Sequence, residues 1–431
     1  MSLQPSMPST PHQERILLLI LAGIQFAHIL DFMVLMPLAP LLMKNLSIST
    51  QQFALLVSIY TLAAAFSGIF AATFVDLFER KRVLLVFFSL FGLSTFWCAL
   101  AGSFETLLLA RALAGAFGGV LAAMVQTMVA DLIPFERRGK ASGSVMSATA
   151  VASVVGVPLA LLLSNLFGWR VPFAAIGLLT LGFFVLAVLR LPTLRTHLSA
   201  AEQSAWRQPF AKMTAVLKER NHRIAILFMA LGGGSTFIVI PYVALYLSST
   251  AGLDESQIPL VYAIGGIASF FSARRIGRLA DEWGKVRSYR IVALLSIIPI
   301  FILTHLPVVA LGWVLLVTTV FFGLGPGRAV SAMAITISAV KPPLRGTFMS
   351  LNAAIQQLAC GVAAYLGSLL ISQQDNGVMV GFGHAGWAAI AITGLTIYLS
   401  GQIQMHQIPT LAVSTQAASP DAELLVVKAN Q

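Results

Sequence analysis

The chain has 431 residues, of which 58% are hydrophobic and 10% are charged, and its formal net charge is +11 at pH 7. Soluble domains carry about 25% charged residues, so one water-soluble core cannot hide this many apolar side chains. A lipid bilayer is the expected solvent. A basic excess can signal a nucleic-acid partner. Here the basic residues occupy short loops between apolar runs, so we expect no nucleic acid.

Apolar stretches near or above the roughly 18-residue length of a membrane-spanning helix recur along the chain. The short alternating segments that are typical of a β-barrel do not occur, so we expect an all-α membrane protein with twelve transmembrane helices. The predicted spans are 16–43, 51–75, 83–101, 105–130, 141–166, 171–190, 223–248, 258–280, 288–306, 309–336, 346–372 and 379–402.

The basic residues orient these spans. Most of the 27 lysines and arginines fall in the even-numbered loops, whereas the odd-numbered loops hold Lys44 and Arg170. Because loops rich in lysine and arginine stay in the cytoplasm, both termini are predicted to be cytoplasmic. The longest connection divides the spans six and six. The expected units are a tail at 1–15, a bundle at 16–190, a linker at 191–222, a second bundle at 223–402, and a disordered tail at 403–431.

Two short patterns recur in both halves of the chain. An acidic and basic segment follows the second span at 76–81 and the eighth span at 281–285, and an Arg-Gly pair precedes the fifth span at 138–139 and the eleventh at 345–346. The number of residues between the two copies is nearly the same for both patterns. We interpret the chain as a duplicated six-helix unit, which predicts two pseudo-symmetric bundles.

These loop segments resemble the signature of the major facilitator superfamily, and the resemblance covers residues 15–402. The family pattern Gly-x-Leu-Ala-Asp-Arg-x-Gly-Arg/Lys is nearly complete at 277–285. It is degenerate at 72–81, where Asp76, Arg80 and Lys81 survive. The segment 111–115 is similar to the Arg-x-x-x-Gly motif of the fourth span, and 31–40 is close to the proline pattern of the first.

The fifth span resembles the antiporter motif of the family's drug:proton antiporter branch. It contains Gly156-Val-Pro158, in which Val157 interrupts the usual Gly-Pro, and Leu161-Leu162 replaces the usual Gly-Gly. The resemblance implies the major facilitator fold, with the first, fourth, seventh and tenth helices around a central cavity, in the cytoplasmic (inner) membrane of a bacterium.

The resemblance also implies a gate on the cytoplasmic side. A carboxylate there can meet the positive end of a helix from the opposite half, so Asp281 would reach the region of Arg138 and Asp76 that of Arg345. The alternative is that these charges only anchor loops at the inner leaflet. The expected gate residues are Asp76, Arg80, Arg138, Gly277, Asp281, Gly284, Lys285 and Arg345.

Asp31, Arg111 and Arg328 are ionisable residues inside predicted spans, where a charge costs about 2.5–3.5 kcal/mol on insertion scales. Asp31 lies roughly 22 Å along the first span and Arg111 roughly 9 Å from the outer end of the fourth, at 1.5 Å per residue. The two fall at similar depth and can form a pair. Burial favours the neutral form of a carboxyl group, whereas a nearby arginine favours the ionised form. A carboxyl group under both influences is suited to take up and release a proton. His28 can assist or only pack, and the pair itself can be static.

Other polar residues are candidates for the substrate cavity. Arg328 follows a Gly-Pro-Gly segment and would bind an anionic substrate group, gate the inner half or snorkel inward. The three glycines at 232–234 mark a second bendable helix on the cavity side. The expected cavity residues are Gln25, Gly115, Gln126, Arg328, Asn352 and Gln356, although the amides can instead tie helices together.

We therefore predict a monomeric, proton-coupled exporter of a small molecule such as a drug, sugar or metabolite. The alternatives are a proton symporter that imports a metabolite and a membrane receptor or assembly factor that does not transport. No nucleotide-binding loop, metal-ligand spacing or nucleophile elbow points to an enzyme or a cofactor. Cys98 and Cys360 lie far apart in apolar stretches and are expected to be buried rather than paired.

Overall fold

The computed structural model describes residues 11–74, 78–192, 208–340, 344–374 and 377–405. The first half contains α1 (Pro11–Val34), α2 (Ala39–Leu46), α3 (Thr50–Phe74), α4 (Arg80–Leu100), α5 (Phe104–Leu132), α6 (Phe135–Val151), η2 (Ala152–Gly156), α7 (Val157–Phe167) and α8 (Arg170–Arg190). The second half contains α10 (Gln208–Lys218), α11 (Arg220–Phe237), η3 (Ile240–Tyr242), α12 (Val243–Ser249), η4 (Glu255–Gln257), α13 (Ile258–Glu282), α14 (Lys285–Thr304), α15 (Leu311–Ser338), α16 (Arg345–Leu369), β1 (Ser372–Gln373), β2 (Met379–Val380) and α17 (Phe382–Ser400).

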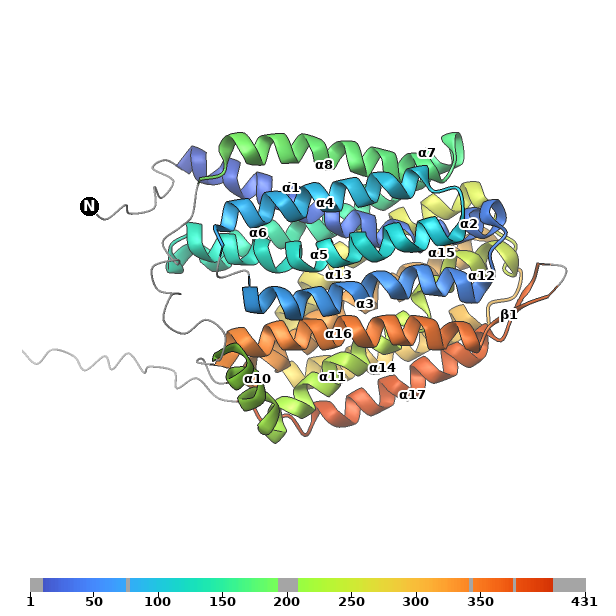
Figure 1. The fold of residues 1–431 in the computed structure, drawn as a ribbon. Coiled ribbons are helices and arrows are strands. Elements are labelled where there is room, and N and C mark those ends of the chain that lie inside the picture. The colour runs from blue at the N-terminus through green and yellow to red at the C-terminus, as the bar shows by residue number, and fades with distance from the viewer. Residues whose placement is uncertain (1–10, 75–77, 193–207, 341–343, 375–376, 406–431) are drawn as a thin grey trace, which may run out of the picture.

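The long helices run side by side along one axis (Figure 1), and α1–α8 and α11–α17 form two groups that meet where α3 packs against α16 and where η2 packs against α13. We call these groups the first and second bundles. The end that carries α2, α12 and β1 is called the outer end, and the end that carries α10 the inner end. α1 begins within the predicted tail 1–15. The rest of that tail, residues 193–207 of the linker and the tail after 405 lie outside the described residues.

In the described ranges, eleven helical segments are long and apolar enough to cross a membrane. The remaining predicted span corresponds to α16, which has 25 residues but whose amides, at Asn352, Gln356 and Gln357, lower its hydropathy. The predicted all-helical membrane fold of two bundles is confirmed. A two-residue antiparallel ribbon, β1–β2, is the one departure in the described chain from an all-helical structure.

The first helix of each half is broken near its outer end, where we predicted continuous spans. α1 stops at Val34 and α2 starts at Ala39, because Pro37 has no N–H for the carbonyl of Met33 and its ring crowds that turn. In the second half, the break between α11 and α12 contains Pro241. The duplicated unit therefore repeats in structure as well as in sequence.

The fifth helix carries a π-helical turn, η2, between α6 and α7. The N–H of Val157 reaches back five residues to the carbonyl of Ala152. Pro158 cannot donate to the next carbonyl, so the regular α-helical pattern is interrupted here. The antiporter-like residues Gly156 and Pro158 therefore lie at an irregular turn of a helix that packs against α1 and α13.

The apolar core joins the two bundles at one end only. At the outer end, one cluster combines residues of both bundles, such as Leu42 with Leu245 and Val57 with Ala364. At the inner end there are two separate clusters, one built from residues 17–191 and one from residues 216–403. In the described chain, the two bundles therefore share one core at the outer end and have separate cores at the inner end.

Close backbone approaches hold the bundles together where they meet. Ser58 on α3 donates a 2.7 Å hydrogen bond to the carbonyl oxygen of Gly361 on α16. On the opposite side, a Cβ atom at Gly266 of α13 would lie only 2.5 Å from the carbonyl oxygen of Ser153 in η2. These small residues allow helix backbones to touch without a large interlocking side chain, which permits sliding or tilting.

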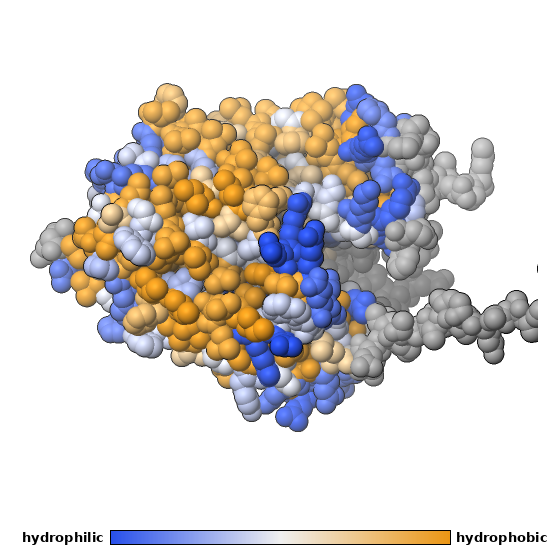
Figure 2. Space-filling model, turned by 180° about the vertical axis from the view of Figure 1, so that it is seen from behind, coloured by the Kyte–Doolittle hydropathy of each residue, from blue (hydrophilic) through white to orange (hydrophobic). Residues whose placement is uncertain are grey.

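The surface is that of a membrane protein. Figure 2 shows hydrophobic side chains over the sides of the helices and hydrophilic ones gathered toward the ends. Large apolar side chains such as Leu93, Leu189 and Phe271 are more than half exposed. An apolar surface of this extent would aggregate in water, so it fits burial in lipid.

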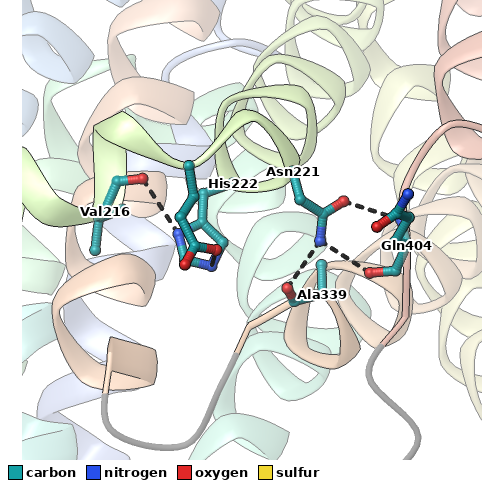
Figure 3. Close-up of polar contacts among 6 residues, drawn as sticks. Val216, Asn221, His222, Ala339 and Gln404 are labelled. Carbon is teal, nitrogen blue, oxygen red and sulfur yellow. Dashed lines mark hydrogen bonds and ion pairs between the residues drawn. The ribbon is translucent and has the colours of Figure 1, made fainter.

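Polar contacts join α10 to the inner end of the second bundle (Figure 3). Asn221, at the start of α11, donates to the carbonyl oxygens of Ala339 (3.0 Å) and Gln404 (2.9 Å) and accepts from the backbone N–H of Gln404. His222 contacts the carbonyl oxygen of Val216 on α10 at 3.2 Å. These bonds fix the ends of α11, α15 and α17 at the inner end of the second bundle.

Candidate functional site

Asp31 on α1 and Arg111 on α5 form a fully buried ion pair. Nη1 of Arg111 lies 2.9 Å from Oδ2 of Asp31 and also donates to the backbone carbonyl of Asp31 at 3.3 Å. The guanidinium lies 4.3 Å from the centre of the Tyr60 ring on α3, a cation–π contact. The structure therefore pairs Asp31 and Arg111, the two residues for which the rise per residue predicted a similar depth in the membrane.

The pair uses only part of its hydrogen-bonding capacity. Oδ1 of Asp31 and Nε and Nη2 of Arg111 are buried without a hydrogen-bond partner in the described chain. The Thr95 hydroxyl approaches the carboxylate from α4, but outside strict hydrogen-bond geometry. Buried polar atoms without partners are uncommon in folded proteins. The unpartnered carboxylate oxygen can accept a proton, and the unpartnered N–H groups can donate to a water molecule.

The rest of the polar stripe on α1 also faces the interior of the first bundle. The His28 ring lies between Tyr60 (6.4 Å between ring centres) and Phe91 (5.9 Å). Its close approach to α5 depends on Gly118, where a Cβ atom would lie 2.6 Å from the imidazole. Nδ1 of His28 and Oε1 of Gln25 are buried without partners among the described residues. These groups form a polar layer around the ion pair.

A separate cavity of about 460 Å³ lies between the bundles. It is bordered by α1, the π turn, α11, α13, α14, α15 and α16. Asp31 and Arg111 do not border it. Another hollow of about 480 Å³ lies at the outer surface beside Lys44 and Asp254, away from the buried arginines. We regard the interior cavity as the candidate substrate site, because concave, mainly apolar hollows with few polar groups are typical of ligand sites.

The sequence-predicted cavity residues divide into two groups. Arg328 and Gln356 border the cavity, whereas Gln25, Gly115, Gln126 and Asn352 do not. Gly115 instead lets α5 approach the backbone of Tyr60 on α3. For these four residues, a substrate role stays a prediction.

Arg328 is buried and hydrogen-bonded to neutral groups. Its Nη2 donates to the hydroxyls of Thr236 (2.6 Å) and Ser235 (2.9 Å) and to the carbonyl oxygen of Gly232 (3.4 Å). Its Nη1 donates to the hydroxyl of Thr393 at 3.1 Å. The side chain connects α15 to α11 and α17 at the cavity wall rather than extending toward the inner surface.

Sequence reasoning missed most of the apolar cavity wall. Ile29, Phe32 and Met33 follow one side of α1 at helical spacing, and such stripes usually indicate ordinary core packing. The available signal was the cluster of helix-disturbing residues, because the predicted bendable segments at 232–234 and 325–327 do border the cavity in part. Phe32 also connects the two sites, since its ring lies 5.3 Å from that of Tyr60 and 5.9 Å from that of Phe237.

The gate residues of the second half are not joined to the first half. Asp281 is exposed, and no hydrogen bond or ion pair links it to Arg138 or to any other described residue. Lys285 donates to the Ser338 hydroxyl at 2.6 Å. Gly284 has a φ of +88° at the start of α14, which explains the motif glycine, while Gly277 meets only ordinary packing.

Arg80 and Arg138, the described gate residues of the first half, contact residues of their own bundle. Arg80 pairs with Asp131 at 3.2 Å, and Arg138 donates to the carbonyl oxygen of Ile133 at 2.9 Å. Arg345 begins α16, and its Nε has no hydrogen-bond partner within the ranges that the structure covers. Asp76 lies outside the described residues, so its contact with Arg345 stays a prediction.

Comparison with known proteins identifies relatives over most of the chain. The sequence profile of the Major Facilitator Superfamily matches residues 21–364. The uncharacterized MFS-type transporter YtbD of Bacillus subtilis is 25% identical over 84% of this chain and 88% of its own. A chloramphenicol efflux pump of Mycobacterium tuberculosis is 25% identical over 82% of this chain and 85% of its own.

Solved structures share the fold at lower identity. A bacterial homolog of the human lysosomal transporter Spinster, in an inward-facing and occupied conformation, has a TM-score of 0.72 and 16% identity, covering 92% of this chain and 97% of its own. A D-xylose–proton symporter also has a TM-score of 0.72, with 17% identity, covering 91% of this chain and 98% of its own.

The ion pair predicts non-additive effects on stability. We expect Asp31→Asn and Arg111→Gln each to destabilise the protein by about 3–5 kcal/mol, because each leaves the other charge buried and unpaired. The double variant should lose less stability than the sum of the losses in the two single variants, since neither charge remains. Thermal or denaturant unfolding of the purified protein in one detergent checks this. Small, additive losses would show that the pair is not energetically coupled.

Proposed function

The chain belongs to the major facilitator superfamily, and from this premise we propose that it exports a small molecule in exchange for protons. The observation that carries the proposal is the fully buried Asp31–Arg111 pair, which lies beside the cavity but is closed off from it. The chloramphenicol efflux pumps among its relatives favour export. In this proposal the protein acts as a monomer in a bacterial cytoplasmic membrane, with both termini in the cytoplasm.

Asp31 would carry the proton. Burial disfavours the charged carboxylate and the guanidinium favours it, so a small movement of α5 relative to α1 can change proton occupancy. A proton would occupy Oδ1, which has no hydrogen-bond partner in the described structure. The protonated, neutral Asp31 would leave Arg111 without a counter-charge, which favours hydration or displacement of the guanidinium. His28 would assist through its buried imidazole, one helical turn away.

Aromatic contacts supply a route between the proton site and the cavity. The Arg111 guanidinium contacts the Tyr60 ring, Tyr60 stacks on Phe32, and Phe32 borders the cavity and stacks on Phe237 of the second bundle. A shift of Arg111 would thus move the wall that substrate touches. In this proposal, the charge change at Asp31 and Arg111 drives the movement along this route.

We assign the structure to the inward-facing state. The shared core at the outer end and the two separate cores at the inner end support this assignment. In the alternate, outward-facing state, the inner ends would close and Asp281 would meet the start of α6 near Arg138. The exposed, unbonded position of Asp281 here fits a latch that is open in this state.

Proton coupling is tested by transport in proteoliposomes with an imposed pH gradient, with chloramphenicol as the first substrate in the screen. Asp31→Asn should reduce gradient-driven flux to background but retain counterflow of labelled substrate, because exchange without net proton movement needs no titrating group. Glu105→Gln, an exposed carboxylate at the outer end of α5, is the matched control and should retain both. Gradient-driven flux that survives in Asp31→Asn would exclude Asp31 as the coupling group.

The latch is tested by spin-label distances between the inner ends of α6 and α13. A hydrogen bond to a charged group contributes about 1.5–3 kcal/mol, so Asp281→Asn should lower the population of the closed inner end by about tenfold or more. Glu282→Gln removes the neighbouring exposed carboxylate and should leave the distances unchanged. Equal behaviour of the two variants would support the alternative that these charges only anchor the loop.

A further inference from the structure

Within the described residues, no charged group compensates the charge of Arg328. Every hydrogen bond that its guanidinium makes in the described structure goes to a hydroxyl or a backbone carbonyl. Nearby Tyr289 is neutral and donates its own hydroxyl hydrogen to Thr396 at 2.7 Å. The side chain starts roughly 15 Å from the inner end of α15, at 1.5 Å per residue. A cation at this depth is unfavourable without a counter-ion.

No carboxylate in the described part of the second bundle is placed to supply one. Those carboxylates lie at helix ends, at Glu219, Asp254, Glu255, Asp281 and Glu282. The other carboxylate deep in the described chain is that of Asp31, which already pairs with Arg111. The two buried arginines therefore differ in kind, because one has a protein counter-ion and the other faces a cavity.

A structural tie alone does not explain a permanent charge at this position. Arg328 joins α15 to α11 and α17, but a neutral amide side chain could also donate to their hydroxyls. A guanidinium adds a fixed positive charge and donors in a planar fork that matches a carboxylate. The charge becomes useful only when an anion enters the cavity.

The remaining cavity wall is mainly apolar and aromatic. Phe32 and Met33 of α1 line it together with Phe237, Phe321 and Phe322 of the second bundle. Tyr262 also borders the cavity, and its hydroxyl is buried without a hydrogen-bond partner among the described residues. A volume of about 460 Å³ lies within the range of pockets for drug-sized ligands.

We propose that the cavity binds an amphipathic organic monoanion, with its carboxylate or similar group at Arg328 and its apolar body against the aromatic wall. This substrate class rests on the proposed function, since it assumes that the cavity is the transport site. It also has an energetic consequence. Each proton that enters in exchange for one monoanion leaving moves two positive charges inward, so an inside-negative membrane potential would assist export.

Equilibrium binding to the purified protein in lipid nanodiscs tests this without any proton gradient. The probes are matched pairs of a carboxylate and its neutral amide: 2-naphthoate and 2-naphthamide, 4-phenylbutyrate and 4-phenylbutyramide, and decanoate and decanamide. Titration calorimetry, corrected with empty nanodiscs, should show at least one carboxylate binding about tenfold or more tighter than its amide, equivalent to about 1.4 kcal/mol.

Three variants locate the preference. Arg328→Lys keeps the charge and should retain a preference for the carboxylate, whereas Arg328→Gln should abolish it. Because Arg328→Gln can fail to fold, Gln356→Glu provides a second test. Gln356 borders the cavity and packs against Gly233, next to the Gly232 carbonyl that Arg328 contacts, so a glutamate there supplies the missing counter-ion. The Gln356→Glu variant should also lose the preference for the carboxylate over the amide.

The outcomes separate the substrate class from the transport mechanism. If no carboxylate binds tighter than its amide, or if the preference survives Gln356→Glu, the proposal is wrong even when proton-linked flux of a neutral compound is observed. If the preference is present and depends on Arg328 while no proton-linked flux occurs, the anion site stands and the proton-coupling proposal fails.

Discussion

A charged group in the low-dielectric interior of a membrane protein must be neutralised, hydrated or matched by a ligand. Two arginines of the described chain lie at that depth, and the groups around their guanidinium differ. Arg111 has Asp31 at 2.9 Å and the Tyr60 ring against its face, inside the first bundle. Arg328 has hydroxyls and a carbonyl, at the wall of the cavity. The proposed separation of proton site and substrate site follows from this difference.

The packing allows these sites to respond to one another. Both bundles share one core at the outer end, and the contacts that continue inward, at Ser58–Gly361 and Gly266–Ser153, are backbone approaches between helices. Such contacts can tilt without breaking an interlocked core. The aromatic series Tyr60, Phe32 and Phe237 crosses the same boundary. A change of charge at Asp31 therefore lies close to the surfaces that must move during alternating access.

Much of the architecture could be predicted from hydropathy, charged loops and the repeat, and depth counting was enough to place Asp31 beside Arg111. Periodicity shows which residues share a helix face, but not which neighbour that face contacts. The sequence therefore does not tell whether the stripe of Gln25, His28 and Asp31 faces the interior of the first bundle, as it does in the structure, or the cavity. The latch contact of Asp281 depends on the conformational state, which local sequence does not encode.

Infrared spectroscopy of the reconstituted protein tests the central claim most directly, because a protonated carboxylic acid has a carbonyl band that a carboxylate lacks. Our account predicts a buried carboxylic-acid band that titrates with pH, weakens when substrate binds and is missing in Asp31→Asn. A carboxylate at position 31 that stays ionised at every pH, with and without substrate, would contradict it.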